Sequence, residues 1–131
     1  MTDAPGVARL LLDTHVLVWW LQGSPELSEE LRERIDTELE VYVSAASVWE
    51  LSIKMALGTL PAPDDLLVWV QRSGLSELPI SLEHGDVASR LPPIHRDPFD
   101  RVLIAQTLVE RLTLVTRDGL IQQYDVPVLR A

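Results

Sequence analysis

Short apolar runs alternate along the chain with longer stretches in which apolar residues recur every three or four positions. The short runs end at polar or turn residues and predict strands at 9–12, 41–43, 78–80, 112–116 and 126–129. The helical spacing predicts helices at 15–21, 28–39, 45–57, 64–73, 82–91 and 98–112, with a short helix at 120–124. Strands and helices that alternate in this way predict one α/β domain over residues 1–131, a three-layer α/β/α sandwich with a mainly parallel central sheet.

The composition fits one folded domain and excludes several other classes of protein. Of the 131 residues, 47 % are apolar, which is enough to bury one core and argues against disorder. Asp13 and His15 interrupt the longest apolar run, so no segment approaches the roughly 20 apolar residues that a membrane span requires. The chain has no cysteine, which excludes a disulfide framework or a thiolate metal site and predicts a reducing, cytoplasmic location.

The charge balance is acidic, with 20 acids against 11 bases and a formal net charge of −9. A protein that binds nucleic acid through a broad basic surface has more basic than acidic residues. The sequence therefore excludes a basic nucleic-acid clamp.

Four acids stand at places where an α/β sheet presents its ligand site. Asp13 and Asp118 follow predicted strands, and ligands of such sheets bind beyond the carboxyl ends of the strands. Glu50 and Asp100 lie near predicted helix starts, where acids also serve as caps. Taken singly, Glu50 completes a capping box with Ser47 and Asp118 caps the helix at 120–124, whereas Asp13 has no such simple role.

A convergence of these acids would need a cation. Two carboxylates about 4 Å apart repel by roughly 4 kcal/mol at an effective dielectric constant near 20. All-oxygen ligands suit Mg²⁺ or Mn²⁺ better than zinc, and such an ion activates water and stabilises charge on a phosphate. The three histidines lack the spacing of a zinc site and are predicted to be packing or hydrogen-bonding residues.

Four segments, in this order, closely resemble PIN-domain proteins, and most closely the VapC-type toxins of bacterial toxin–antitoxin pairs. The resemblance covers essentially the whole chain and rests on Leu11-Leu12-Asp13-Thr14-His15, on 44–50 (SAASVWE), on 95–106 (HRDPFDRVLIAQ) and on Leu114-Val115-Thr116-Arg117-Asp118. It implies a PIN-like fold and a metal-dependent endoribonuclease that hydrolyses RNA with a metal-activated water.

The resemblance also implies roles for individual residues. Asp13, Glu50 and Asp100 match the central acids of the family, and Asp118 matches its more variable fourth acid. Asp13 and Asp100 would hold the principal Mg²⁺ or Mn²⁺, with Glu50 and Asp118 completing or orienting its hydration shell. Asp97 is interpreted mainly as a helix cap.

Several hydroxyl and basic side chains close to these acids in the sequence also have predicted roles. By resemblance, Thr14 and Thr116 place hydroxyls beside the metal or its waters. Lys54 lies four residues after Glu50 and is expected to pair with it. Three arginines stand within four residues of a proposed ligand and are expected to add positive charge locally; they are Arg96, Arg101 and Arg117.

The implied partners are an RNA substrate, a cognate VapB-type antitoxin lying along the early helices, and a second copy of the chain in a homodimer. Four tryptophans are predicted to lie mostly in the core, although some of their surface could instead receive a partner. They are Trp19, Trp20, Trp49 and Trp69.

Three other classes of protein fit the sequence poorly, and one non-catalytic alternative remains. A haloacid-dehalogenase-like phosphatase needs an acid where this chain has His15, and a phosphotransfer receiver needs a lysine after a late strand. The chain lacks the glycine-rich loop of a P-loop enzyme. A non-catalytic interaction module on the same PIN-like fold is the main alternative.

Overall fold

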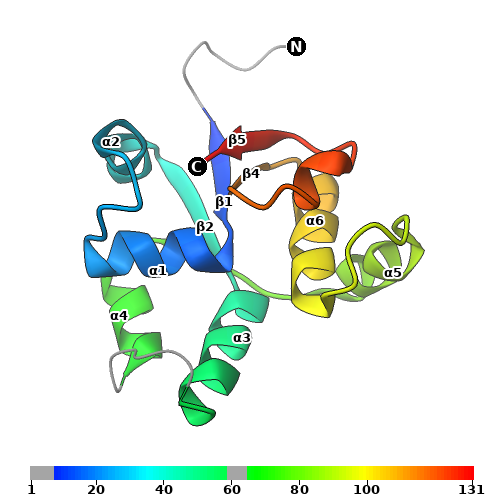
Figure 1. The fold of residues 1–131 in the computed structure, drawn as a ribbon, viewed down its shortest axis with the longest axis horizontal. Helices are drawn as coiled ribbons and strands as arrows, with labels where there is room; N and C mark the ends of the chain where they lie inside the picture. The colour runs from blue at the N-terminus through cyan, green and yellow to red at the C-terminus, as the bar shows by residue number, and fades with distance from the viewer. Residues whose placement is uncertain (1–7, 59–64) are drawn as a thin grey trace.

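A computed structural model describes residues 8–58 and 65–131 and shows five parallel strands in one sheet (Figure 1). The strand order is β3-β2-β1-β4-β5, and every pairing between neighbours is parallel. The strands are β1 (Arg9–Leu12), β2 (Glu40–Ser44), β3 (Ser76–Leu78), β4 (Thr113–Thr116) and β5 (Val128–Arg130). The predicted parallel sheet is confirmed.

Each predicted long helix corresponds to a helix of the structure. They are α1 (Thr14–Gln22), α2 (Glu29–Thr37), α3 (Ala45–Ala56), α4 (Leu66–Arg72), α5 (Leu82–Arg90) and α6 (Pro98–Glu110). The helix expected at 120–124 is one 3₁₀ turn, η1 (Ile121–Gln123). Among these described helices, none is both long and apolar enough to cross a membrane.

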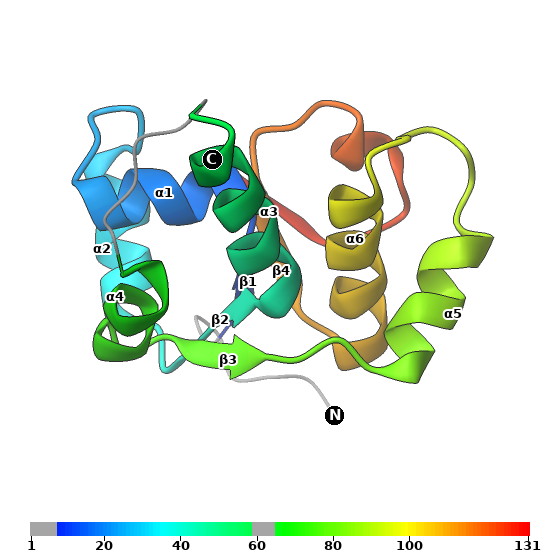
Figure 2. The ribbon, with the colours of Figure 1, turned by 90° about the horizontal axis from the view of Figure 1, so that it is seen from below.

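The alternation of side chains along β1 separates the two faces of the sheet. Leu10 and Leu12 belong to one buried cluster with residues of α1 and α2, whereas Leu11 belongs to a second cluster with Leu103 and Ile104 of α6. Successive strand residues point to opposite faces, so a central strand buried on both sides must be apolar throughout. Figures 1 and 2 show α1 and α2 on one side of the sheet and α5 and α6 on the other, which confirms the three-layer sandwich.

Some predicted boundaries are wrong for identifiable reasons. The edge strand ends at Leu78 and does not include Pro79, because proline has no N–H for the ladder. The last strand runs over Val128–Arg130 and begins after Pro127, two residues later than expected. Helix α2 ends at Thr37, so Leu39 is 92 % exposed instead of continuing the apolar face. Residue 64 of the expected helix at 64–73 lies outside the described residues.

The tryptophans are less buried than predicted. Trp19 and Trp20 are half-buried at the edge of the first cluster, whereas Trp49 and Trp69 are 62 % and 54 % exposed. The core prediction is therefore wrong for Trp49 and Trp69. Both stand on helix faces that the single chain leaves uncovered.

Candidate functional site

The parallel topology brings the predicted acids to one edge of the sheet. Asp13 joins the end of β1 to the start of α1, and its N–H donates to the carbonyl of Val115 in β4 at 3.0 Å. Asp118 follows β4, and Asp100 lies in the first turn of α6. Glu50 comes from α3, which packs against both α1 and α6 (Figure 2).

Asp13 is held by a hydroxyl from the neighbouring strand. Its side chain is buried, and Oδ2 accepts a hydrogen bond from Oγ1 of Thr116 at 2.6 Å. The same threonine oxygen accepts from the backbone N–H of Asp118 at 3.0 Å. Burial raises the pKa of Asp13 above its ordinary value, and the hydrogen bond from Thr116 opposes that shift. Thr116 thus fixes one acid directly and the turn that carries another.

His95 joins the other two aspartates, which confirms the predicted hydrogen-bonding role, although the sequence did not predict these partners. Its Nε2 lies 3.0 Å from Oδ2 of Asp100 and 3.0 Å from Oδ2 of Asp118. Its Nδ1 accepts from the backbone N–H of Asp97 at 3.2 Å, so this network assigns the proton to Nε2. The available signal was its place two residues before Asp97, the cap of the helix that carries Asp100.

The contacts of His95 make it a positioning residue. Ligand atoms of His95, Asp100 and Asp118 lie within 4.8 Å of one another, close enough to share a metal ion. With its proton on Nε2, however, the imidazole donates to the carboxylates, and a donor nitrogen has no lone pair for a metal. Orientation of ligating carboxylates by a second group is a common feature of metal sites.

The carboxylates raise one another's proton affinity. The pKa of Asp100 rises to about 7, first because the group is buried and then because Asp13 and Asp97 lie nearby. Burial alone would raise the pKa of Asp118 as well, but hydrogen bonds from His95 and from the N–H groups of Leu120 and Ile121 lower it overall. Two acids of one site therefore have pKa values shifted in opposite directions.

Glu50 and Lys54, which both lie on α3, form an ion pair. Lys54 Nζ donates to Oε2 of Glu50 at 2.9 Å, as expected from their spacing. The other oxygen, Oε1, is buried and has no hydrogen-bond partner among the described residues. The predicted Ser47–Glu50 capping box is wrong, because Ser44 caps α3 and Ser47 instead bonds to the hydroxyl of Thr14 at 2.9 Å.

These observations fit a hard divalent cation. A buried carboxylate oxygen without a partner is costly, and burial together with repulsion from nearby carboxylates raises the pKa of Asp100. A cation among the acids would give the buried oxygen of Glu50 a partner and would offset the repulsion at Asp100. Carboxylate oxygens are the ligands that Mg²⁺ and Mn²⁺ prefer. Asp13 and Glu50 do not belong to the tight group of His95, Asp100 and Asp118, but both are near enough to raise the pKa of Asp100.

Two of the acids also cap helices, as predicted. Asp97 Oδ1 accepts from the N–H groups of Phe99 and Asp100 at the start of α6. Asp118 Oδ1 accepts from the N–H of Leu120 at 2.8 Å and leaves Oδ2 for His95. A carboxylate that caps with one oxygen can therefore still face the site with the other.

The three arginines that were expected to add positive charge near the site differ in their contacts. The guanidinium of Arg101 donates to backbone carbonyls before α6, and that of Arg117 binds Glu26 and lies 4.4 Å from the ring centre of Trp19. Arg96 is exposed. The charge of Arg117 is paired with Glu26, whereas the acceptors of Arg101 are uncharged and include the carbonyl of His95, so the expected positive charge near the site is kept at Arg101.

Comparisons with known proteins agree with this fold. Residues 10–127 match the model of the PIN domain. Ribonuclease VapC22 of Mycobacterium tuberculosis is 27 % identical over 124 residues, covering 92 % of this chain and 95 % of that protein. A chain of the DNA-bound VapBC complex of Salmonella typhimurium is 17 % identical, with a TM-score of 0.71 over 95 % of this chain and 98 % of that one. A chain of a toxin–antitoxin complex from Klebsiella pneumoniae is 15 % identical, with a TM-score of 0.65 over 92 % and 95 %.

Proposed function

The chain belongs to the PIN domain family, and from this premise we propose that it is a Mg²⁺- or Mn²⁺-dependent endoribonuclease and the toxin of a toxin–antitoxin pair. The observation that carries the proposal is the raised pKa of Asp100, which is buried and lies close enough to Asp13, Asp97 and Glu50 to feel their charges, together with the close approach of Asp100, Asp118 and His95. The similarity to a named ribonuclease over nearly the whole of both chains supports RNA as the substrate.

In this proposal Asp13 and Asp100 hold the principal cation, with Glu50 and Asp118 completing or orienting its shell. The ion would supply Lewis-acid chemistry, because it polarises a phosphodiester and lowers the pKa of an attacking water molecule. Carboxylates must be ionised to bind it, so the raised pKa of Asp100 predicts weaker metal binding below about pH 7.

The remaining side chains of the site hold these acids in place. Thr116 directs Oδ2 of Asp13, and His95 keeps a proton on Nε2 between Asp100 and Asp118. Lys54 fixes Oε2 of Glu50 and leaves Oε1 for the site. Preorganised groups of this kind lower the reorganisation needed during reaction.

The partners in this proposal follow from the structural neighbours. The Klebsiella structure is a toxin–antitoxin complex and the Salmonella structure is a VapBC complex bound to DNA. We propose that an antitoxin binds this chain in the same manner, and that the protein acts on RNA in the cytoplasm. Formation of a homodimer stays a prediction.

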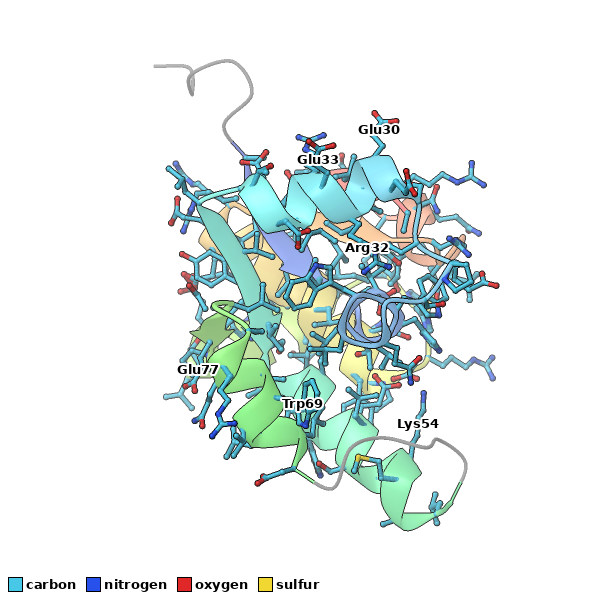
Figure 3. The ribbon with its side chains drawn as sticks, turned by 90° about the vertical axis from the view of Figure 1, so that its left-hand side faces the viewer. Glu30, Arg32, Glu33, Lys54, Trp69 and Glu77 are labelled. Carbon is cyan, nitrogen blue, oxygen red and sulfur yellow. The ribbon has the colours of Figure 1, made fainter. Side chains whose placement is uncertain are left out.

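The purified protein should cut single-stranded RNA when Mg²⁺ or Mn²⁺ is present and should stop when EDTA is added. Cleavage of an end-labelled RNA, followed on denaturing gels, measures this directly. Glu30→Gln, an exposed acid on α2 (Figure 3), provides a matched control that should cut normally. Equal cutting by wild type and Asp13→Asn would refute the proposed site, because Asp13 is one of its principal ligands. Metal binding without cleavage by the wild type would favour the non-catalytic interaction module.

The toxin assignment makes a separate prediction in living cells. Induced expression of the wild type should arrest bacterial growth, whereas Asp13→Asn expressed to the same level should not, because the arrest requires RNA cleavage. Co-expression of the cognate antitoxin should restore growth, measured as colony counts after induction. Normal growth of cells that contain protein shown to cut RNA would contradict the toxin assignment and leave the ribonuclease activity intact.

A further inference from the structure

An aromatic pair joins the two helices that carry Glu50 and Asp100, and one ring of the pair is largely exposed. Trp49 of α3 and Phe99 of α6 meet edge to face, with ring centres 5.2 Å apart and ring planes at 83°. Trp49 directly precedes Glu50, and Phe99 directly precedes Asp100. Each of the two helices therefore carries an aromatic residue directly before its proposed acid in the sequence, and the two rings touch.

The pair leaves much of one ring available to a ligand. Trp49 is 62 % exposed although it contacts Phe99, whose side chain is half-buried against the start of α6. An edge-to-face contact is a preferred geometry of aromatic rings and restricts the orientation of the indole. A large apolar surface held in one orientation at the edge of a site has the form of a stacking platform.

Because the chain is acidic, a stacking contact would supply RNA affinity that electrostatic attraction does not. The net charge is −9 and the single lysine binds Glu50, so long-range electrostatics oppose the approach of a polyanion. The charge of Arg117 is paired with that of Glu26. Stacking of a base on an aromatic ring does not depend on net charge, and alanine substitution of such a ring typically weakens binding about tenfold or more per base.

We propose that Trp49 stacks on an unpaired nucleobase of the RNA substrate, adjacent to the phosphodiester that is cut, and that Phe99 holds the indole in position. This inference rests on the proposed ribonuclease activity and adds the substrate feature that the site reads. The base must be unpaired, because the faces of a base within a helix are covered by its neighbours. Trp49 is thus a substrate-binding residue and takes no part in proton transfer or metal binding.

The first test compares the kinetics of three variants on a single-stranded RNA. Trp49→Ala should raise KM about tenfold with kcat changed less than about threefold, whereas Trp49→Phe should retain most of the affinity, because a smaller ring still stacks. Trp69→Ala is the matched control, since Trp69 is similarly exposed but lies on α4 (Figure 3) and should be neutral. Unchanged KM in Trp49→Ala overturns the proposal.

The second test asks whether Trp49 is coupled to one particular base. A set of RNAs carries a single abasic residue at successive positions around the cut. At one position the abasic substitution should weaken cutting by the wild type about tenfold and leave Trp49→Ala unaffected. Because both changes remove the same contact, their effects should not add. Additive effects at every position overturn the proposal.

Two further measurements distinguish the remaining explanations: the oligomeric state of the variant, and whether the wild type cuts RNA at all. Sedimentation should show the same oligomer for wild type and Trp49→Ala. An oligomer that dissociates in the variant, with no coupling to any base, overturns the proposal in favour of a second copy of the chain covering Trp49. A wild type that cuts no RNA overturns both the ribonuclease and the stacking, whereas a wild type that cuts without the coupling overturns the stacking alone.

Discussion

Replacement of Asp100 by asparagine should lower the rate of RNA cleavage by at least about a thousandfold, because it removes a charged ligand from the proposed metal site. The asparagine side chain has nearly the same shape, so α6 and its cap should be retained. Single-turnover cleavage at saturating Mn²⁺ measures the effect, with Glu30→Gln as the matched control. Retention of more than a tenth of the wild-type rate would show that Asp100 does not belong to the reacting site.

The same substitution should stabilise the metal-free protein at alkaline pH. The pKa of Asp100 is about 7 in the folded chain against an ordinary value of 3.8, so the folded state binds its proton more tightly. Its contribution to stability is therefore complete below about pH 4, declines as the pH rises, and is lost above about pH 7. Asparagine carries no such penalty and should raise the free energy of unfolding at pH 8 by on the order of 1 to 3 kcal/mol relative to wild type.

Urea denaturation in EDTA at pH 5 and pH 8 provides the measurement. The difference between Asp100→Asn and wild type should widen as the pH rises, and added Mn²⁺ should reduce it by stabilising the wild type. A difference that is constant with pH would mean that Asp100 titrates normally in the folded chain. A substitution that destroys activity while it increases stability is typical of a site where like charges are held together for function.

The parallel topology explains why two of the acids proposed from the sequence lie at the same edge of the sheet. In a parallel sheet the residues after successive strands emerge at one edge, so Asp13 and Asp118 had to lie near each other once the strands were recognised. The caps at Asp97 and Asp118 were predictable for a similar reason, since they depend on residues two or three positions away.

Residues whose roles depend on the path of a loop could not be predicted in the same way. His95 bridges Asp100 and Asp118 because the loop before α6 is fastened to Tyr124, whose hydroxyl accepts from the His95 N–H at 2.8 Å. Nothing in the local pattern specifies that contact across 29 positions. Trp49 was misjudged because its helix has apolar residues on more than one face, and periodicity does not show which face a neighbour covers.

Replacement of Arg101 by methionine should destabilise the protein by about 3 kcal/mol. The guanidinium donates four hydrogen bonds to backbone carbonyls in the segment before α6, and hydrogen bonds to charged groups contribute about 1.5 to 3 kcal/mol each without being additive. The acceptors are the carbonyls of Ala88, Leu91, Pro92 and His95, at 2.7 to 3.2 Å. Methionine keeps much of the apolar stem but leaves these carbonyls without their donor.

The matched control is Arg90→Met at the end of α5, where the guanidinium forms an exposed pair with Asp86. Such surface pairs contribute little, so this variant should remain within about 0.5 kcal/mol of wild type in urea denaturation. Equal stability of the two variants would show that the carbonyls before α6 are satisfied without Arg101.

Activity at a temperature where Arg101→Met is still folded separates stability from positioning. Arg101 binds the carbonyl of His95, and the imidazole of that residue orients Asp100 and Asp118. The folded variant should therefore cut RNA about 10- to 100-fold more slowly, as expected when a group that orients metal ligands is disturbed. Its affinity for Mn²⁺ should fall in parallel, measured by calorimetry. A folded variant with wild-type activity would mean that the loop keeps His95 in place without the guanidinium, and that Arg101 contributes to stability alone.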